Sequence, residues 1–291
     1  MSAQRQPLPG DRWHFQHGPI DIVIGADGDA NAVAAAHEAA WQRFTTVLDE
    51  LVAELPTLRR PIAGPCPLRG IVAQRMWAAC RPFHAGYITP MAAVAGSVAQ
   101  ELIAGYRRDG VQRAWVNNGG DIALHLAPGQ ALKVGLVTDP TRPAARTAAG
   151  LLRTDADFEV HASLPVRGIA TSGWRGRSFS LGIADSVTVL ARTAAEADAA
   201  ATIVANAVDV AAPGIVRRPA KTVKDDSDLG DIPVTVEVPP LPAELIQRAL
   251  TAGRRRAREL RAAGLLWSAA LVCQGFAVTL DDEHPPRQLV Q

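Results

Sequence analysis

Apolar residues recur every three or four positions over five stretches of the chain, and this spacing predicts helices. The longest helix follows the polar segment 27–29 and ends near Leu55, because Pro56 comes next. A Thr193-x-x-Glu196 capping box marks the start of the predicted helix 193–208. The predicted helix 91–108 is lined with alanine, glycine and serine, so we expect another element to pack very close to it. The predicted helices are 30–55, 68–80, 91–108, 193–208 and 243–263.

Short apolar runs, separated by glycine and proline about every ten residues, predict strands in the middle and at the end of the chain. Because the helices gather mainly around this central run, the pattern favours an α+β fold with an antiparallel or mixed sheet flanked by helices. We predict a single domain over 1–280, a loop or edge segment at 213–240 and a flexible C-terminal tail over 281–291. The predicted strands are 20–24, 112–116, 122–126, 132–137, 158–162, 168–172, 186–191 and 269–280.

Composition and charge narrow the class of protein. Of the 291 residues, 48% are hydrophobic, enough for a packed core. Lys and Arg number 30 against 29 Asp and Glu, so the formal net charge of +1 disfavours nucleic acid as a partner. Cys66, Cys80 and Cys273 are too far apart in the sequence for a disulfide framework or a thiolate zinc site. No apolar stretch is long enough to span a membrane, so we expect a cytoplasmic protein with no membrane partner.

A polar loop, Asn117-Asn118-Gly119-Gly120-Asp121, joins two predicted strands. Its two glycines would let the backbone approach a ligand, and the flanking side chains of Asn118 and Asp121 could hydrogen-bond a polar group of that ligand. Asn-Gly is also a strong hairpin signal, so a simple turn is the alternative interpretation. The loop is therefore a candidate binding segment.

The strand 168–172 ends in small hydroxyl residues followed by a glycine. Thr171, Ser172 and Gly173 could contact a phosphate through hydroxyl and backbone donors, although an ordinary strand end is the alternative. In the next residues, Trp174 could stack on a flavin or adenine ring and Arg175 could pair with a phosphate. A glycine-rich surface loop explains that pair equally well.

The helix opened by the capping box carries Asp198 and Thr202, four residues apart and so on one face. Alanines between them leave room above the helix. A carboxylate and a hydroxyl suit a hard cation such as Mg²⁺, which is often held by few protein ligands and completed by phosphates and water. An exposed polar face is the alternative interpretation of the same spacing.

The order of these segments resembles the ApbE-like superfamily, the FAD:protein FMN transferases, over roughly residues 86–210. A small-residue helix, N-x-G-G-D-I, A-T-S-G, S-V-T-V-L-A and A-D-A-x-A-T follow one another as in that superfamily. The resemblance implies one ApbE-like domain related to the T-fold, with FAD or FMN and Mg²⁺ as cofactors. It implies an enzyme that splits the pyrophosphate of FAD and attaches FMN to a threonine of a protein acceptor.

Carried over residue by residue, the resemblance places the metal on Asp198 and Thr202, with a backbone carbonyl near Ala93 or Val94 as a further candidate. It places Asn118, Gly119, Gly120 and Asp121 beside the flavin. Thr171, Ser172 and Gly173 would line the cofactor site.

This chain also departs from the superfamily. A lysine usually precedes the glycine of the small-residue helix, and here that residue is Ala95. The usual His-x-x-Asp-Pro-x-Thr-Gly segment is missing from the interval 174–185. The pattern thus resembles the shorter branch of the superfamily, a protein family of unknown function. Asp185 is the carboxylate placed to substitute for the missing aspartate as a catalytic residue.

Two functions follow from this balance. Asp198 and Thr202 favour a Mg²⁺-dependent FMN transferase, or a FAD pyrophosphatase-like enzyme, that binds a small-molecule nucleotide. The missing segment favours a non-catalytic binding or assembly protein in cofactor metabolism. The small-residue helix and the C-terminal strand could also serve a homodimer.

Overall fold

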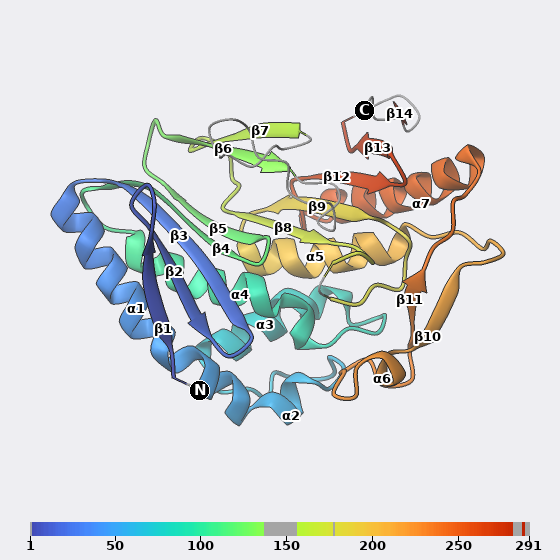
Figure 1. Ribbon diagram of the computed structural model, residues 1–291, viewed down its shortest axis with the longest axis horizontal. Coiled ribbons are helices and arrows are strands. Elements are labelled where there is room, and N and C mark those ends of the chain that lie inside the picture. Colours follow the sequence, from blue (N-terminus) through green and yellow to red (C-terminus); the bar gives the residue numbers. More distant parts are fainter. Residues whose placement is uncertain (1, 137–155, 177, 282–286, 289–291) are drawn as a thin grey trace. The chain divides into compact units, whose positions relative to one another are not determined.

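The computed structural model describes residues 2–136, 156–176, 178–281 and 287–288 (Figure 1). The chain forms two compact units, each made of three chain segments. Unit 1 comprises Met1–Leu132, His161–Ala170 and Leu190–Ala199. Unit 2 comprises Lys133–Val160, Thr171–Val189 and Ala200–Gln291. Five elements have residues in both units: β6 (Ala131–Leu136), β7 (Ala156–His161), β8 (Gly168–Ser172), β9 (Ser186–Ala191) and α5 (Ala194–Ala207).

Unit 1 is built on an antiparallel sheet in the order β1-β2-β3-β4-β5. In its part of β8, Ile169 pairs with Ile122 of β5, also antiparallel. Helices α1 and α4 contact each other and pack against this sheet (Figure 1). Its strands and helices are β1 (Gln4–Leu8), β2 (Arg12–His17), β3 (Ile20–Gly28), β4 (Val111–Asn118), β5 (Asp121–Leu126), α1 (Ala30–Ala53), α2 (Leu55–Leu58), α3 (Ile71–Cys80) and α4 (Val94–Ile103). Short 3-10 helices are η1 (Arg81–Phe83), η2 (Pro90–Ala93) and η3 (Ala104–Tyr106).

The predicted helices of unit 1 are confirmed, with sharper ends. The Asp29 carboxylate caps α1 by accepting hydrogen bonds from the backbone N–H groups of Asn31 and Ala32. The predicted helix 91–108 is divided into η2, α4 and η3, so only its middle is α-helical. The capping box at the start of α5 is also present, because the Thr193 hydroxyl accepts from the Glu196 N–H at 3.2 Å.

The β1–β2 hairpin is an element that the pattern did not predict. Three residues, Pro9, Gly10 and Asp11, lie between the paired residues Leu8 and Arg12, and Gly10 and Asp11 have positive φ angles, +75° and +51°. Pro7 is tolerated because β1 is the edge strand of the sheet. The hairpin buries His17, the last residue of β2.

Unit 2 contains α7 (Ala243–Ala262), and in its sheet the order is β9-β12-β13-β14. The predicted strand 269–280 is two strands, β12 (Ser268–Cys273) and β13 (Phe276–Thr279), joined by a turn in which Gln274 and Gly275 have positive φ angles. The segment 213–240 is not a plain loop: β10 (Val216–Pro219), α6 (Ala220–Val223) and β11 (Pro233–Glu237) include a two-stranded antiparallel sheet. The strand β14 (Arg287–Gln288) interrupts the predicted tail, most of which lies outside the described residues.

The α+β class and the antiparallel pairing are therefore confirmed. The single domain over 1–280 stays a prediction, since the contacts define two interleaved units. None of the helices in the described part of the chain is long and apolar enough to cross a membrane.

Candidate functional site

The first turn of α4 meets the first turns of α5 at Gly96, within unit 1. A Cβ atom at Gly96 would lie 2.3 Å from the Ala194 carbonyl oxygen and 2.9 Å from the Asp198 Cβ, so no larger residue fits there. The close neighbour predicted for the small-residue helix is thus α5. Because the two backbones approach so closely, the Gly96 N–H donates a 2.9 Å hydrogen bond to Oδ2 of Asp198.

The polar loop 117–121 is a hairpin turn that also serves this helix contact. Gly119 and Gly120 have positive φ angles and connect β4 to β5, while the Asn117 side chain accepts from the Gly120 N–H at 2.8 Å. The Asn118 side chain is buried and donates to the Ala95 carbonyl at 3.1 Å. The turn interpretation therefore holds for the backbone. The side chains fix the first turn of α4.

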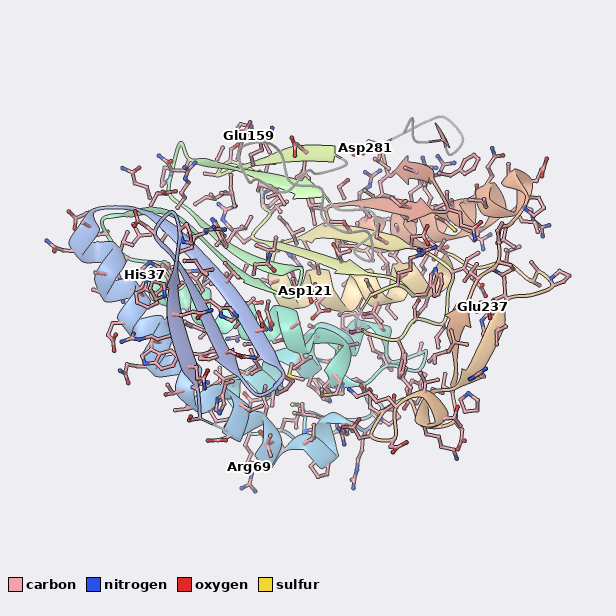
Figure 2. All side chains as sticks on the ribbon, in the orientation of Figure 1. His37, Arg69, Asp121, Glu159, Glu237 and Asp281 are labelled. Atoms are coloured by element: carbon pink, nitrogen blue, oxygen red, sulfur yellow. The ribbon has the colours of Figure 1, made fainter. Side chains whose placement is uncertain are left out.

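Asp121 begins β5 and is buried (Figure 2). Burial raises the pKa of Asp198 well above its ordinary value, and the negative charge of Asp121 raises it further. Hydrogen bonds from the backbone N–H groups of Gly96 and Ala95 oppose this rise without reversing it. Among the described residues, no cationic side chain contributes to the pKa of Asp198. The two carboxylates therefore form a site where a bound cation would be favourable.

The donor set fits Mg²⁺ better than a softer metal. No three His, Cys, Asp or Glu side chains in the described ranges come together as a metal-binding group. Mg²⁺ often takes only one or two protein carboxylates and leaves its other positions to water and phosphates. Asp198 could supply one carboxylate, and Asp121, whose charge raises the pKa of Asp198, could supply a second. Thr202 lies four residues beyond Asp198 on α5, and its role as a ligand stays a prediction.

The predicted phosphate segment lies at the end of β8, in unit 2. Thr171 is exposed, and its hydroxyl shares a 2.9 Å hydrogen bond with the hydroxyl of Thr188 on β9. Gly173 follows, at a position where a Cβ would lie 2.4 Å from the Asp185 carbonyl oxygen. The close approach of the Asp185 backbone explains why residue 173 is a glycine. Contact of Thr171, Ser172 and Gly173 with a cofactor stays a prediction.

Asp185 occupies a buried cluster in unit 2 and already accepts several hydrogen bonds. Its Oδ1 accepts from Nε1 of Trp174 at 3.3 Å and from Nε of Arg175 at 2.8 Å. Its Oδ2 accepts from the backbone N–H of Gln274 in the β12–β13 turn. The Arg175 guanidinium also lies over the Trp174 ring at 5.1 Å. Asp185 therefore links three segments of unit 2, and its predicted catalytic role requires it to leave some of these bonds.

The resemblance offered a backbone carbonyl near Ala93 or Val94 as a part of the site, but it did not predict the backbone groups of Ala95 and Gly96, which contact Asn118 and Asp198. The sequence contained an indirect signal, since a glycine in a run of small helical residues indicates a close approach. It gave no sign of which backbone group would hold which side chain. His84, which precedes this helix in the sequence, is exposed, and its Nδ1 hydrogen-bonds with the Arg81 carbonyl at 3.0 Å.

Comparison with known proteins agrees with the resemblance. The family model described as AbpE bacteria matches residues 4–279. A UPF0280 protein of Methanopyrus kandleri is 35% identical over 191 residues, covering 64% of this chain and 69% of that one. One from Methanosphaerula palustris is 32% identical over 199 residues, covering 68% and 77%. A third, from Methanothrix thermoacetophila, is 37% identical over 138 residues, which span 47% of this chain and about half of that relative, 52%.

Among solved structures, the crystal structure of Pseudomonas stutzeri flavinyl transferase ApbE in its apo form matches with a TM-score of 0.47 and 14% sequence identity. The match covers 95% of this chain and 92% of that one. The match to the family model extends over nearly the whole sequence and is enough to assign the family. The chain therefore belongs to the ApbE-like superfamily, in the family described as AbpE bacteria, as its order of motifs predicted.

Proposed function

We propose that this protein binds a flavin or a related nucleotide together with Mg²⁺, and that Asp198 is the principal metal ligand. The observation that carries the proposal is the buried Asp198 carboxylate, which the Gly96 N–H orients at 2.9 Å; burial raises its pKa, and repulsion from the negative charge of Asp121 raises it further. A divalent cation would neutralise this repulsion and gain hard oxygen ligands. FAD, FMN and ADP each carry phosphates that could complete its coordination.

The residues of unit 1 would hold the metal in a fixed position. The Gly96 N–H occupies Oδ2 of Asp198 and so orients the carboxylate, while Asn118 holds the same turn of α4 through the Ala95 carbonyl. Thr202 is the second ligand that the resemblance implies. When bound, Mg²⁺ would supply charge neutralisation for phosphoryl transfer, where positioning and electrostatics account for most of the catalysis.

The test is calorimetric titration of the purified protein with FAD, FMN and ADP, with and without Mg²⁺. We expect binding that requires Mg²⁺ and weakens by about a hundredfold or more in Asp198→Asn, since removing even an outer-shell partner of a metal typically costs 10–100-fold. Asp21→Asn is the matched control, because Asp21 is a carboxylate of the same unit that pairs with His14 at 3.1 Å. Equal affinity in Asp198→Asn and the parent protein would contradict the metal assignment.

A non-catalytic binding or assembly role is the second candidate, and the arrangement of Asp185 favours it. The carboxylate that would replace the missing catalytic aspartate is engaged by Trp174, Arg175 and Gln274. Incubation with FAD and Mg²⁺, followed by chromatography for AMP and FMN, separates the two functions. Release of AMP would establish turnover and reject the second candidate, whereas binding without AMP release would support it.

A further inference from the structure

Four charged side chains, Arg43, Glu50, Arg75 and Glu101, join helices α1, α3 and α4 of unit 1. Arg43 of α1 donates to Oε1 of Glu101 on α4 through Nε at 2.7 Å, and its two Nη atoms bind Glu50 at 2.6 and 2.8 Å. Arg75 of α3 donates to Oε2 of Glu101 through Nη2, also at 2.7 Å. Burial raises the pKa of Glu101, but hydrogen bonds from Arg43 and Arg75 outweigh that effect and lower it. Glu101 is thus an ionised carboxylate clamped between two guanidinium groups.

Arg75 contacts α4 at a second point. Its Nη1 donates to the backbone carbonyl of Ser97 at 3.1 Å while Nη2 holds Glu101, one helical turn further on. A planar guanidinium can make both bonds at once because its donors point in fixed, divergent directions. Arg75 therefore constrains both the position and the rotation of the first turn of α4.

Three consecutive residues of that turn make backbone hydrogen bonds with side chains from other elements of unit 1. Ala95 accepts from Asn118, Gly96 donates to Asp198 and Ser97 accepts from Arg75, in three consecutive residues. A shift of α4 would change the Gly96–Asp198 hydrogen bond directly, because Gly96 already sits against α5 with no room for a Cβ atom. The contact is therefore sensitive to the position of the helix.

We infer that Arg75 is a positioning residue for the metal site: by gripping α4 at Ser97 and Glu101, it places the Gly96 N–H that orients Asp198. The inference rests on the proposed function for its metal-binding consequence. The placement of the Gly96 N–H is independent of any metal. Outer-shell groups that orient a ligand typically change metal affinity by 10–100-fold when they are removed.

The informative substitution is Arg75→Lys. A lysine ammonium keeps the charge opposite Glu101 but is a single point donor group, so it cannot reproduce the divergent pair of bonds to Glu101 and the Ser97 carbonyl. Glu50→Gln is the matched control: it alters the same charge cluster, but the described hydrogen bonds of Glu50 go to Arg43 and Thr46, both on α1. A general loss of stability would appear in both variants.

The experiment measures two quantities on the full chain. The first is the chemical shift and hydrogen-exchange rate of the Gly96 amide proton in ¹⁵N-labelled, metal-free protein. In Arg75→Lys we expect this proton to shift upfield and to exchange faster. In Glu50→Gln we expect neither change. The second is Mn²⁺ affinity by electron paramagnetic resonance; we expect about a tenfold loss in Arg75→Lys and no change in the control.

The outcomes separate the two proposals. An unaltered Gly96 amide in folded Arg75→Lys, or an equal change in Glu50→Gln, would overturn the positioning role. If the parent protein binds no Mn²⁺, the proposed function fails while the amide measurement still decides the role of Arg75. If Arg75→Lys does not fold, Glu101→Gln is the second variant, because it keeps the side-chain volume and removes the charge that holds Arg75. Glu101→Gln must then shift the Gly96 amide proton resonance upfield as well, and an unchanged chemical shift would overturn the inference.

Discussion

The ionised form of Asp198, the proposed metal ligand, is unfavourable in the metal-free folded protein. Its pKa is raised by burial and by the charge of Asp121, so the folded protein binds this proton more tightly than the unfolded chain does. The contribution of Asp198 to stability therefore falls as the pH rises from the ordinary pKa of an aspartate to its raised value. Such a cost is common where a site is arranged for a ligand rather than for the empty protein.

Asp198→Asn should accordingly stabilise the metal-free protein at neutral pH. The asparagine keeps an oxygen for the Gly96 N–H and removes the repulsion from Asp121. We expect a gain of about 1 kcal/mol, which corresponds to an increase in Tm of roughly 2–4 °C for a chain of this size or slightly smaller. Thermal melts at about pH 8 and about pH 4 check the sign, because the difference should shrink at the acid end, where the aspartate is protonated. A lower Tm at both pH values would contradict the argument.

Gly96→Ala tests the close approach of α4 and α5. The added Cβ would lie 2.3 Å from the Ala194 carbonyl oxygen, so the helices must separate, and overpacking of this kind typically costs about 1–3 kcal/mol. Gly105→Ala is the control, because the nearest atoms to its Cβ are at an ordinary 3.6 Å. In urea unfolding, the midpoint and the free energy of unfolding should fall markedly for Gly96→Ala and change little for Gly105→Ala. Equal midpoints would contradict the contact.

At the scale of single residues, the sequence predicted the candidate side chains of the site better than it predicted their hydrogen-bond and ion-pair partners. Asn118, Asp121 and Asp198 were found through the order of motifs, and the structure brings all three to the first turn of α4 or beside it. The partners of Glu101 could not be predicted. Arg43 and Arg75 stand 58 and 26 residues away along the chain, and ion pairs at such separations leave no local pattern.

The β12–β13 hairpin is an element whose geometry depends on one carboxylate. Asp185 accepts from the N–H of Gln274, whose φ angle is +44°, and the Gln274 side chain bonds to Pro239 and Leu241 before α7. A non-glycine residue in this conformation persists only where its surroundings hold it. Asp185 and the 239–241 segment provide that hold.

Asp185→Asn should therefore weaken this hairpin. It removes the ion pair with Arg175 while keeping an oxygen for Gln274, so we expect a loss of about 1–3 kcal/mol in the free energy of unfolding. Calorimetry of Mg²⁺ binding should show no change. If Asp185 is instead the catalytic residue, the variant should lose turnover with unfolding unchanged, and chemical denaturation alongside an AMP-release assay distinguishes the two.

Local signals explain which elements could be predicted. The helices α1 and α5 carry capping residues and a helical period, and both were predicted close to their observed ends. The β1–β2 hairpin has mostly exposed side chains on β1, so it lacks the apolar alternation of a half-buried strand. The β12–β13 pair was merged because Gln274-Gly275 is a less typical turn than Asn-Gly.

Over the whole molecule, the two units share continuous elements rather than a linker. The chain passes from one unit to the other within β6, β7, β8, β9 and α5. Rupture of any of these would disturb hydrogen bonds in both units. The predicted single domain should therefore appear as one cooperative unfolding unit.

Hydrogen exchange in increasing urea checks this prediction. We expect the amides of β4, in unit 1, and of β12, in unit 2, to lose protection at the same denaturant concentration, with coincident circular dichroism and fluorescence transitions. Separate midpoints for the two strands would show two domains instead.

The interleaving also sets the order of events during synthesis. Residues 1–132 form most of unit 1, but its remaining strand and helix residues come from 161–170 and 190–199. At about 5–20 residues per second, the ribosome needs roughly 3–13 s to reach Ala199 after Leu132. Until Ala170 is reached, roughly 2–8 s after Leu132, the edge of β5 has no β8 to pair with, and an open strand edge is a template for aggregation. A chain stopped near residue 132 would thus leave the ribosome with that edge exposed, a natural substrate for chaperones.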